Sequence, residues 1–112
     1  MHQGAEIMWR LCLVVLAFAM SLQPVLAQEG RIQRGRTFVQ TNCAMCHAVG
    51  RIGESPLSEA PPFRTLQRRY PLEDLAEALA EGIITGHPSM PEFQLDPAQV
   101  NDVIAYLQSI QQ

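Results

Sequence analysis

The sequence predicts a small all-α domain with three helices and a short fourth one. In three segments apolar residues recur at helical spacing, and each segment lies between residues that typically begin or end a helix. No segment alternates apolar and polar residues for long enough to predict a strand. The 112 residues contain no repeat and no low-complexity tract, so we expect a single domain.

The first helix is expected over residues 30–42. Its inner face combines apolar residues with a glycine: Ile32, Gly35, Phe38 and Val39. Asn42 suits the C-terminal cap because asparagine tolerates the backbone geometry found there. Gly35 in mid-helix costs about 1 kcal/mol relative to alanine. We therefore expect another helix to cross closely at Gly35.

The second helix is expected over residues 71–81. Pro71 suits the first helical position, where a missing N–H leaves no bond unmade, and Gly82 suits the stop. Glu73 and Asp74 lie near the positive end of the helix dipole. The apolar stripe consists of Leu72, Leu75, Ala76 and Leu79.

The third helix is expected over residues 97–109. Asp96 is a good N-cap, and Pro97 again suits the first helical position. Tyr106 lies near the edge of the apolar stripe. That stripe consists of Val100, Val103, Ile104, Leu107 and Ile110.

Two loops and a short helix connect these elements. Residues 48–60 and 83–95 are expected to be loops, and residues 63–69 to form a short helix after the Pro61-Pro62 break. The second loop contains Gly86, Pro88 and Pro91. Such a segment is stiff at its prolines but has no regular hydrogen bonds, and a bond to a metal would order it.

Residues 1–27 have the pattern of a secretory signal peptide. Arg10 supplies the positive charge, and Leu11–Met20 is an apolar run too short to span a bilayer unaided. Val25-Leu26-Ala27 provides a cleavage site, and we expect Pro24 to break the helix just before it.

Cleavage after Ala27 predicts a mature domain over residues 28–112, exported to the periplasm, with no stable membrane span. Two alternatives stay open at this point. One places the natural start at Met8, and the other retains the apolar segment as an anchor.

Two thiols and an imidazole stand together in Cys43-Ala-Met-Cys-His47. The pattern C-x-x-C-H is typical of covalent haem attachment. The thiols of Cys43 and Cys46 add across the haem vinyl groups, and His47 places a ring nitrogen on the iron. The sequence therefore predicts one covalent haem c, with Cys43 and Cys46 as the thioether donors and His47 as an axial ligand. The haem would also supply core to a domain that is marginal at this size.

Met90 is the predicted second axial ligand. Met45, the other methionine after residue 27, lies between the two cysteines and cannot reach the opposite haem face. A thioether is a soft ligand that raises the potential and fills the iron site. His87 is the rival, because it lies three residues away in the same loop. Candidate partners for the haem propionates are Arg51, Arg64, Arg68, Arg69 and Tyr70.

Charge excludes one class of function. The chain has 8 basic residues, all arginine, against 11 acidic ones, which gives a net charge of −3. Nucleic-acid binding needs a basic excess, so no nucleic-acid partner is expected. The acids concentrate after Leu72 and the arginines mostly before it, a dipolar pattern that could orient the molecule on a redox partner.

The chain resembles a small, exported bacterial class I c-type cytochrome over residues 30–110. The resemblance depends on the C-x-x-C-H motif, on Gly35 eight residues before it, on Met90, and on Asp102-Val-Ile-Ala-Tyr-Leu107. It implies a cytochrome c fold, in which three to four helices wrap around one covalently attached haem. It also implies that Tyr106 packs on the crossing at Gly35.

The resemblance implies a second contact for His47 and a function. A carbonyl in Ala60-Pro61-Pro62 would accept the proton on the other imidazole nitrogen. The implied function is one-electron transfer in the periplasm, without enzyme activity, between transient redox partners such as an oxidase or a dehydrogenase. The lysine ring and the tryptophan of the mitochondrial relatives are missing, which leaves the usual cationic docking in doubt.

Four other functions make different demands on these residues. A thiol–disulfide enzyme at Cys43 and Cys46 needs a βαβ context that the sequence does not indicate. A zinc site of these cysteines with His47 and His87 is hindered because adjacent residues reach two tetrahedral corners poorly. A haem sensor or redox enzyme with a displaceable Met90 stays open, as does an electron-transfer subunit of an exported dehydrogenase complex.

Overall fold

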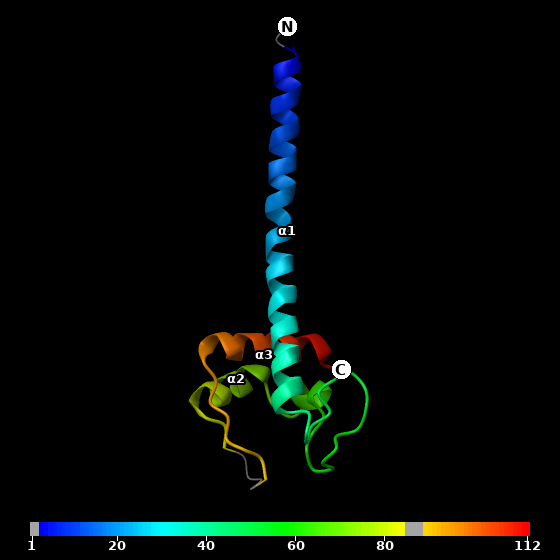
Figure 1. Ribbon diagram of the computed structural model, residues 1–112, viewed down its shortest axis with the longest axis vertical. Helices are drawn as coiled ribbons and strands as arrows, with labels where there is room; N and C mark the ends of the chain where they lie inside the picture. The colour runs from blue at the N-terminus through cyan, green and yellow to red at the C-terminus, as the bar shows by residue number, and fades with distance from the viewer. Residues whose placement is uncertain (1–2, 85–88) are drawn as a thin grey trace.

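The computed structural model describes residues 3–84 and 89–112. Its elements are α1 (Gln3–Asn42), the 3₁₀ helix η1 (Phe63–Arg68), α2 (Leu72–Glu81) and α3 (Pro97–Ile110). Figure 1 shows α1 as a long rod, with all other elements gathered around its C-terminal end. Within the described residues the only β interaction is an isolated antiparallel bridge between Ile83 and Phe93. The all-α prediction is therefore confirmed.

Helix α1 is longer than predicted and begins at Gln3 rather than near Gly30. The expected break at Pro24 was wrong, because Pro24 lies inside the continuous helix. Leu, Ala, Met and Gln flank the proline on both sides, and these strong helix formers outweigh the one backbone bond that it removes. Among the described residues, α1 is the one helix long and apolar enough to cross a membrane, a property that a signal sequence shares.

The two halves of α1 have different surroundings. Its described side chains from residue 3 to residue 29 are all exposed, including large apolar ones such as Trp9 and Phe18. Burial begins near residue 30, and Val39 is only 1% exposed. The folded domain therefore starts close to the predicted mature N-terminus.

The short helix and α2 form nearly where the sequence predicted them. Residues 63–68 form a 3₁₀ helix, and Pro71 lies just outside α2 as its N-cap, with a non-helical ψ of 140°. The prediction that Pro71 occupies the first helical position was therefore wrong by one residue. Gly82 ends α2 as expected, with a φ of 108° that suits glycine.

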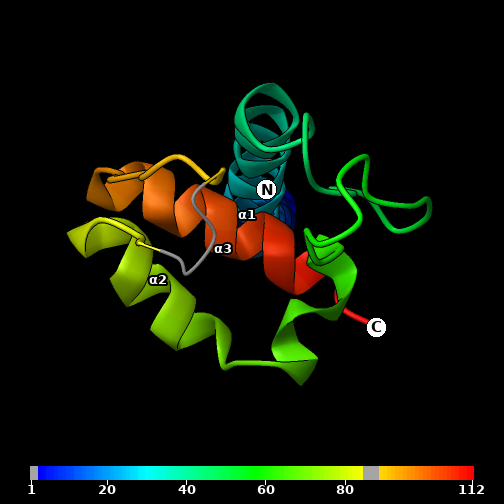
Figure 2. The same ribbon diagram turned by 90° about the horizontal axis from the view of Figure 1, so that it is seen from below.

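Helix α3 packs across α1 (Figure 2) and carries half of the buried apolar residues of the domain. Asp96 caps it as predicted: its side chain accepts from Gln99 N at 2.9 Å, and the Gln99 side chain accepts from Asp96 N at 3.1 Å. The predicted apolar stripe lies in the core. Tyr106 is more buried than an edge position suggests, at 6% exposed. Its hydroxyl donates to Val49 O at 2.7 Å and so ties α3 to the loop that begins at residue 48.

Gly35 marks the crossing of α1 and α3. A Cβ at this position would overlap the backbone carbonyl of Asp102 and would lie 2.9 Å from Tyr106 Cβ. The expected close crossing is therefore confirmed, and Tyr106 packs on it. Beside it, Arg34 and Asp102 form a bidentate ion pair, with Nε–Oδ2 at 2.7 Å and Nη2–Oδ1 at 2.9 Å. The Asp102 carboxylate raises the pKa of Arg34 further.

Candidate functional site

An apolar cavity of about 540 Å³ lies among α1, η1, α2, α3 and the loop after α2. This volume is in the usual range for cofactor and ligand sites. Its apolar walls come from every element of the folded domain, and they include Phe38, Val39, Leu66, Leu75, Phe93 and Leu107. No segment could bury these side chains alone, so the cavity depends on the whole domain.

The predicted attachment motif forms a tight turn directly after α1. Cys43 N donates to Val39 O at 2.8 Å, which continues the helix by one bond, and Cys46 N and His47 N both donate to Cys43 O, at 3.2 and 3.0 Å. This turn places Cys43 and His47 in the wall of the cavity, with Cys46 beside them in the same turn.

The two cysteines of the motif are free thiols, and Cys43 is partly buried. Neither Cys43 nor Cys46 is in a disulfide. Burial raises the pKa of the Cys43 thiol to about 11, because an apolar wall disfavours the thiolate. Within the described residues no three His, Cys, Asp or Glu side chains gather as a metal site.

The orientation of His47 is fixed by two contacts on one side of its ring. His47 Nδ1 lies 2.8 Å from Pro61 O, and the Phe63 ring lies 4.8 Å from the imidazole centroid at 40°. A carbonyl can only accept, so Nδ1 carries the proton in this bond. The other nitrogen, Nε2, is then left with a lone pair for a metal. The expected contact with the Pro61 region is confirmed.

Met90 lines the same cavity as Cys43 and His47, from the loop between α2 and α3. The loop is held by two backbone bonds, Ile83 N to Phe93 O and Leu95 N to Leu79 O, both at 2.9 Å. The rival His87 lies outside the described residues. Met45 is 87% exposed and is not part of the cavity wall, as the sequence argument required.

Of the candidate propionate partners, Arg69 and Tyr70 line the cavity. The other three arginines donate to backbone carbonyls elsewhere: Arg51 to Ser109, Arg64 to Gly53 and Arg68 to Gln112. Two acidic residues, Glu59 and Asp74, also line the cavity and were not predicted. Their positions depend on tertiary contacts, so spacing in the sequence gave no signal for them.

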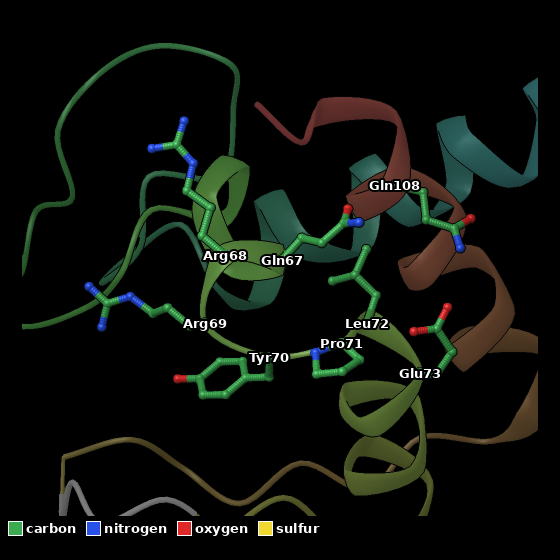
Figure 3. Close-up of a pocket in the computed structure, with 8 residues that line it drawn as sticks. All are labelled: Gln67, Arg68, Arg69, Tyr70, Pro71, Leu72, Glu73 and Gln108. Carbon is green, nitrogen blue, oxygen red and sulfur yellow. The ribbon is translucent and has the colours of Figure 1, made fainter.

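A second, shallower pocket of about 380 Å³ lies where η1 meets α2 and α3 (Figure 3). Arg68 and Arg69 point in different directions there, and both point away from Gln108. Polar side chains that diverge in this way do not converge on one ligand. The first cavity is therefore the candidate site.

The donor set fits haem. The cavity brings together an imidazole with a free nitrogen, a thioether and a cysteine in an apolar enclosure, and these are the groups that hold haem iron and attach its porphyrin. Pro61 and Phe63, which orient the imidazole, were not found by residue spacing; the resemblance alone pointed to the Pro61 carbonyl.

Comparison with known proteins gives the same answer. The family model for cytochrome c matches residues 32–111. The chain is 29% identical to cytochrome c-552 from Bradyrhizobium diazoefficiens over 100 residues, which cover 89% of this chain and 91% of that protein. It is 33% identical to a cytochrome c-553-like protein from Synechocystis sp. over 110 residues, which cover 88% of this chain and 94% of that protein.

The chain belongs to the cytochrome c family. Members of this family carry one covalently bound haem c and transfer electrons to and from redox partners rather than acting as enzymes. The predicted fold, cofactor and general function are thereby confirmed.

Proposed function

We propose that the protein is an exported one-electron carrier whose haem c is joined to Cys43 and Cys46 and ligated by His47 and Met90. The observation that carries this proposal is the wall of the large cavity. Cys43, His47 and Met90 line it together, and His47 Nδ1 donates a hydrogen bond to Pro61 O at 2.8 Å. That hydrogen bond leaves Nε2 as the iron-binding nitrogen.

Each of these residues has a separate task. Cys43 and Cys46 lie in one tight turn, which suits two bonds to one porphyrin edge. His47 supplies a nitrogen ligand of fixed orientation, and Met90 supplies a soft sulfur that favours the reduced iron. When bound, the haem supplies an iron that cycles between Fe(III) and Fe(II). The apolar wall excludes water, which limits the reorganisation that each change of charge requires.

The ligand opposite His47 has a rival in His87. Met90 is supported by its position in the cavity wall. The two ligand sets differ in spectrum, because a methionine sulfur on Fe(III) gives a weak charge-transfer band at the red end of the visible range.

We further propose that residues 1–27 direct export and are removed after Ala27, which leaves residues 28–112 as the periplasmic domain. The uniform exposure of α1 before residue 30 supports this division, since the folded domain makes no use of that segment. The mass of the exported protein tests it. A mass that includes residues 1–27 would indicate a retained anchor instead.

The partners proposed are redox proteins that bind transiently, such as an oxidase or a dehydrogenase. Helix α2 supports a partner with a basic surface, because it carries four exposed acids and no basic residue: Glu73, Asp74, Glu77 and Glu81. Weak electron-transfer contacts are small, so a stable interface is not required.

The test is expression with haem-maturation machinery, followed by mass measurement and a redox-titrated spectrum. We expect one covalent haem, sharp reduced bands of low-spin iron, the red charge-transfer band when oxidised, and no carbon monoxide binding to the native reduced protein. Carbon monoxide binding would favour the sensor with a displaceable Met90. A polypeptide without haem mass, from a host able to attach it, would overturn the proposal.

A further inference from the structure

We propose that Gln111 is a positioning residue for His47, acting through η1 and the Pro61 carbonyl. This inference rests on the proposed function, in which His47 ligates the iron. Gln111 lies just beyond α3, far along the chain from the motif, and neither the family match nor the motif assigns it a role.

The Gln111 amide is fully used. Its Nε2 donates to Phe63 O and to Leu107 O, both at 2.8 Å, and its Oε1 accepts from Gln67 N at 2.9 Å. Leu107 O is one of the carbonyls left without a helical partner at the end of α3. Phe63 and Gln67 lie near opposite ends of η1, so one side chain fixes this short helix against α3.

The Phe63 end of η1, which Gln111 holds, contacts His47 and the residue next to it. Phe63 N donates to Ala48 O at 2.9 Å, next to His47 in the chain, and the Phe63 ring lies 4.8 Å from the imidazole. Pro61 O, which accepts from His47 Nδ1, is only two residues before Phe63. The polar contacts of Gln111 and the imidazole therefore share one short segment.

Pro61 and Pro62 explain why this segment needs an outside anchor. Neither proline has an N–H, so the pair cannot donate a backbone bond of its own. Before them, Ala60 N donates to Leu57 O at 3.0 Å, and Leu57 N donates to Cys46 O at 3.1 Å, within a largely exposed loop. After them, Phe63 is held to the buried end of α3 by Gln111. The Pro61 carbonyl is therefore held from both sides, and Gln111 provides the side-chain anchor that joins the second side to α3.

The three hydrogen bonds of the Gln111 side chain, called the Gln111 tether below, should set the strength of the hydrogen bond from His47 Nδ1 to Pro61 O. A firmly held carbonyl keeps the Nδ1 proton protected and makes the imidazole a stronger donor to iron. A loosened carbonyl weakens the bond, exposes the proton to exchange, and favours Fe(II). Loss of the tether is therefore expected to raise the reduction potential.

The test variant is Gln111→Met, which keeps the length of the side chain and removes its three hydrogen bonds. The control is Gln112→Met. The Gln112 side chain donates to Arg51 O at 3.1 Å, and its contacts to Arg64 and Arg68 use only backbone atoms. Gln111→Glu is a second variant that keeps the acceptor for Gln67 N and loses both donors, and it serves if Gln111→Met does not fold.

The decisive measurement is hydrogen exchange of the His47 Nδ1 proton in the reduced, ¹⁵N-histidine-labelled holoprotein, relative to core amides such as that of Leu107. We expect exchange to be faster by at least about fivefold in Gln111→Met, faster also in Gln111→Glu, whose carboxylate faces the Phe63 and Leu107 carbonyls, and unchanged in Gln112→Met. The reduction potential should be higher in Gln111→Met than in Gln112→Met.

An unchanged His47 exchange rate in the Gln111 variants, relative to the core amides, would overturn the inference even if their melting temperatures fall. Wild type with covalent haem but an unprotected Nδ1 proton would overturn the tether alone. Wild type without covalent haem would overturn the proposed function and the inference with it. The mass and the visible spectrum of the same sample are measured first and show whether haem is attached. Failure of the proposed function is thereby distinguished from failure of the Gln111 inference.

Discussion

The backbone carbonyl of Asp102 occupies the space that a side chain at Gly35 would need. Helices α1 and α3 approach most closely here, and Tyr106 Cβ lies 2.9 Å from the same point. Gly35 is therefore required by the closeness of two backbones and not by an unusual φ. A side chain at position 35 would clash with the backbone of α3, and the clash could be relieved only by moving one of the two helices.

Gly35→Ala should destabilise the holoprotein strongly. Overpacking a close contact typically costs 1–3 kcal/mol, and since backbone must move here we expect about 2–3 kcal/mol. In a domain of this size that lowers the melting temperature by about 10 °C or more. Gly30→Ala is the control in the same helix, because its Cβ would meet only the flexible Arg34 side chain, at 3.4 Å. Equal melting temperatures for the two variants would contradict the steric account.

The ion pair between Arg34 and Asp102 should add a smaller, salt-sensitive stability. The carboxylate raises the pKa of Arg34, so the pair's contribution is present below the ordinary pKa of arginine and is lost only above it. From pH 6 to pH 9, salt is therefore the variable that changes it. We expect Arg34→Met to lower the melting temperature slightly at low salt and less at about 1 M salt.

Asp102→Asn and the double variant complete the thermodynamic cycle for this pair. The double variant should lose no more than either single variant, because each removes the same bidentate contact. Additive losses would show that the two residues act separately.

The local part of the fold could be predicted from the sequence, whereas of the long-range part only the close crossing at Gly35 was. Asp96, Pro97 and the apolar stripe predict α3 because capping and periodicity act within a few residues. The bond between Gln111 and Phe63 joins residues 48 apart, and the Arg34–Asp102 pair spans 68. Such contacts depend on how helices cross, which residue spacing does not encode.

The candidate site divides in the same way. Haem attachment at residues 43–47 could be predicted from spacing alone, because the three functional residues of the motif lie in one turn. The Pro61 carbonyl was reached by resemblance, and Phe63 was not anticipated beside the imidazole. Pro24 shows the opposite failure, where a reliable local rule was outweighed by strong helix formers on both sides of the proline.

Met90→Ala should remove the proposed sulfur ligand without removing the haem. Because a thioether favours Fe(II), we expect a lower reduction potential, loss of the red charge-transfer band and new binding of carbon monoxide. The matched control is Met45→Ala, which removes a methionine that is 87% exposed and outside the cavity wall. A wild type without the red band, whose low-spin spectrum is unchanged in Met90→Ala and altered in His87→Ala, would assign the ligand to His87.

Without its covalent haem the domain should lose its cooperative fold. A dry cavity of 540 Å³ would cost at most about 13 kcal/mol at 24 cal/mol per Å³, which is as large as the whole stability of a small domain. Exposure of the cavity to solvent lowers this figure, but a folded domain of this size has little stability in reserve.

The variant for this prediction is Cys43→Ala with Cys46→Ala, purified and stripped of any non-covalent haem. We expect reduced helical circular dichroism and no sharp thermal transition. Cys12→Ala is the control, since Cys12 is exposed in the segment proposed to be removed, and it should behave as wild type. A sharp transition in the haem-free double variant would contradict the dependence of the fold on haem.

Charge near the cavity should select between small redox reagents. The chain has a net charge of −3, and the exposed Asp74 lines the cavity at the start of the acidic face of α2. A cationic metal complex should therefore exchange electrons with the protein faster than an anionic complex of equal driving force, and salt should reduce the difference. Asp74→Asn should reduce the preference by about two- to fivefold at low salt, because Coulomb energies at contact are about 1 kcal/mol in water.

Glu54→Gln removes the same unit of charge from an exposed loop position outside the cavity wall and should have a smaller effect. Stopped-flow rates over a range of salt give both comparisons, and equal effects of the two variants would mean that net charge alone, and not the charge beside the cavity, controls the approach.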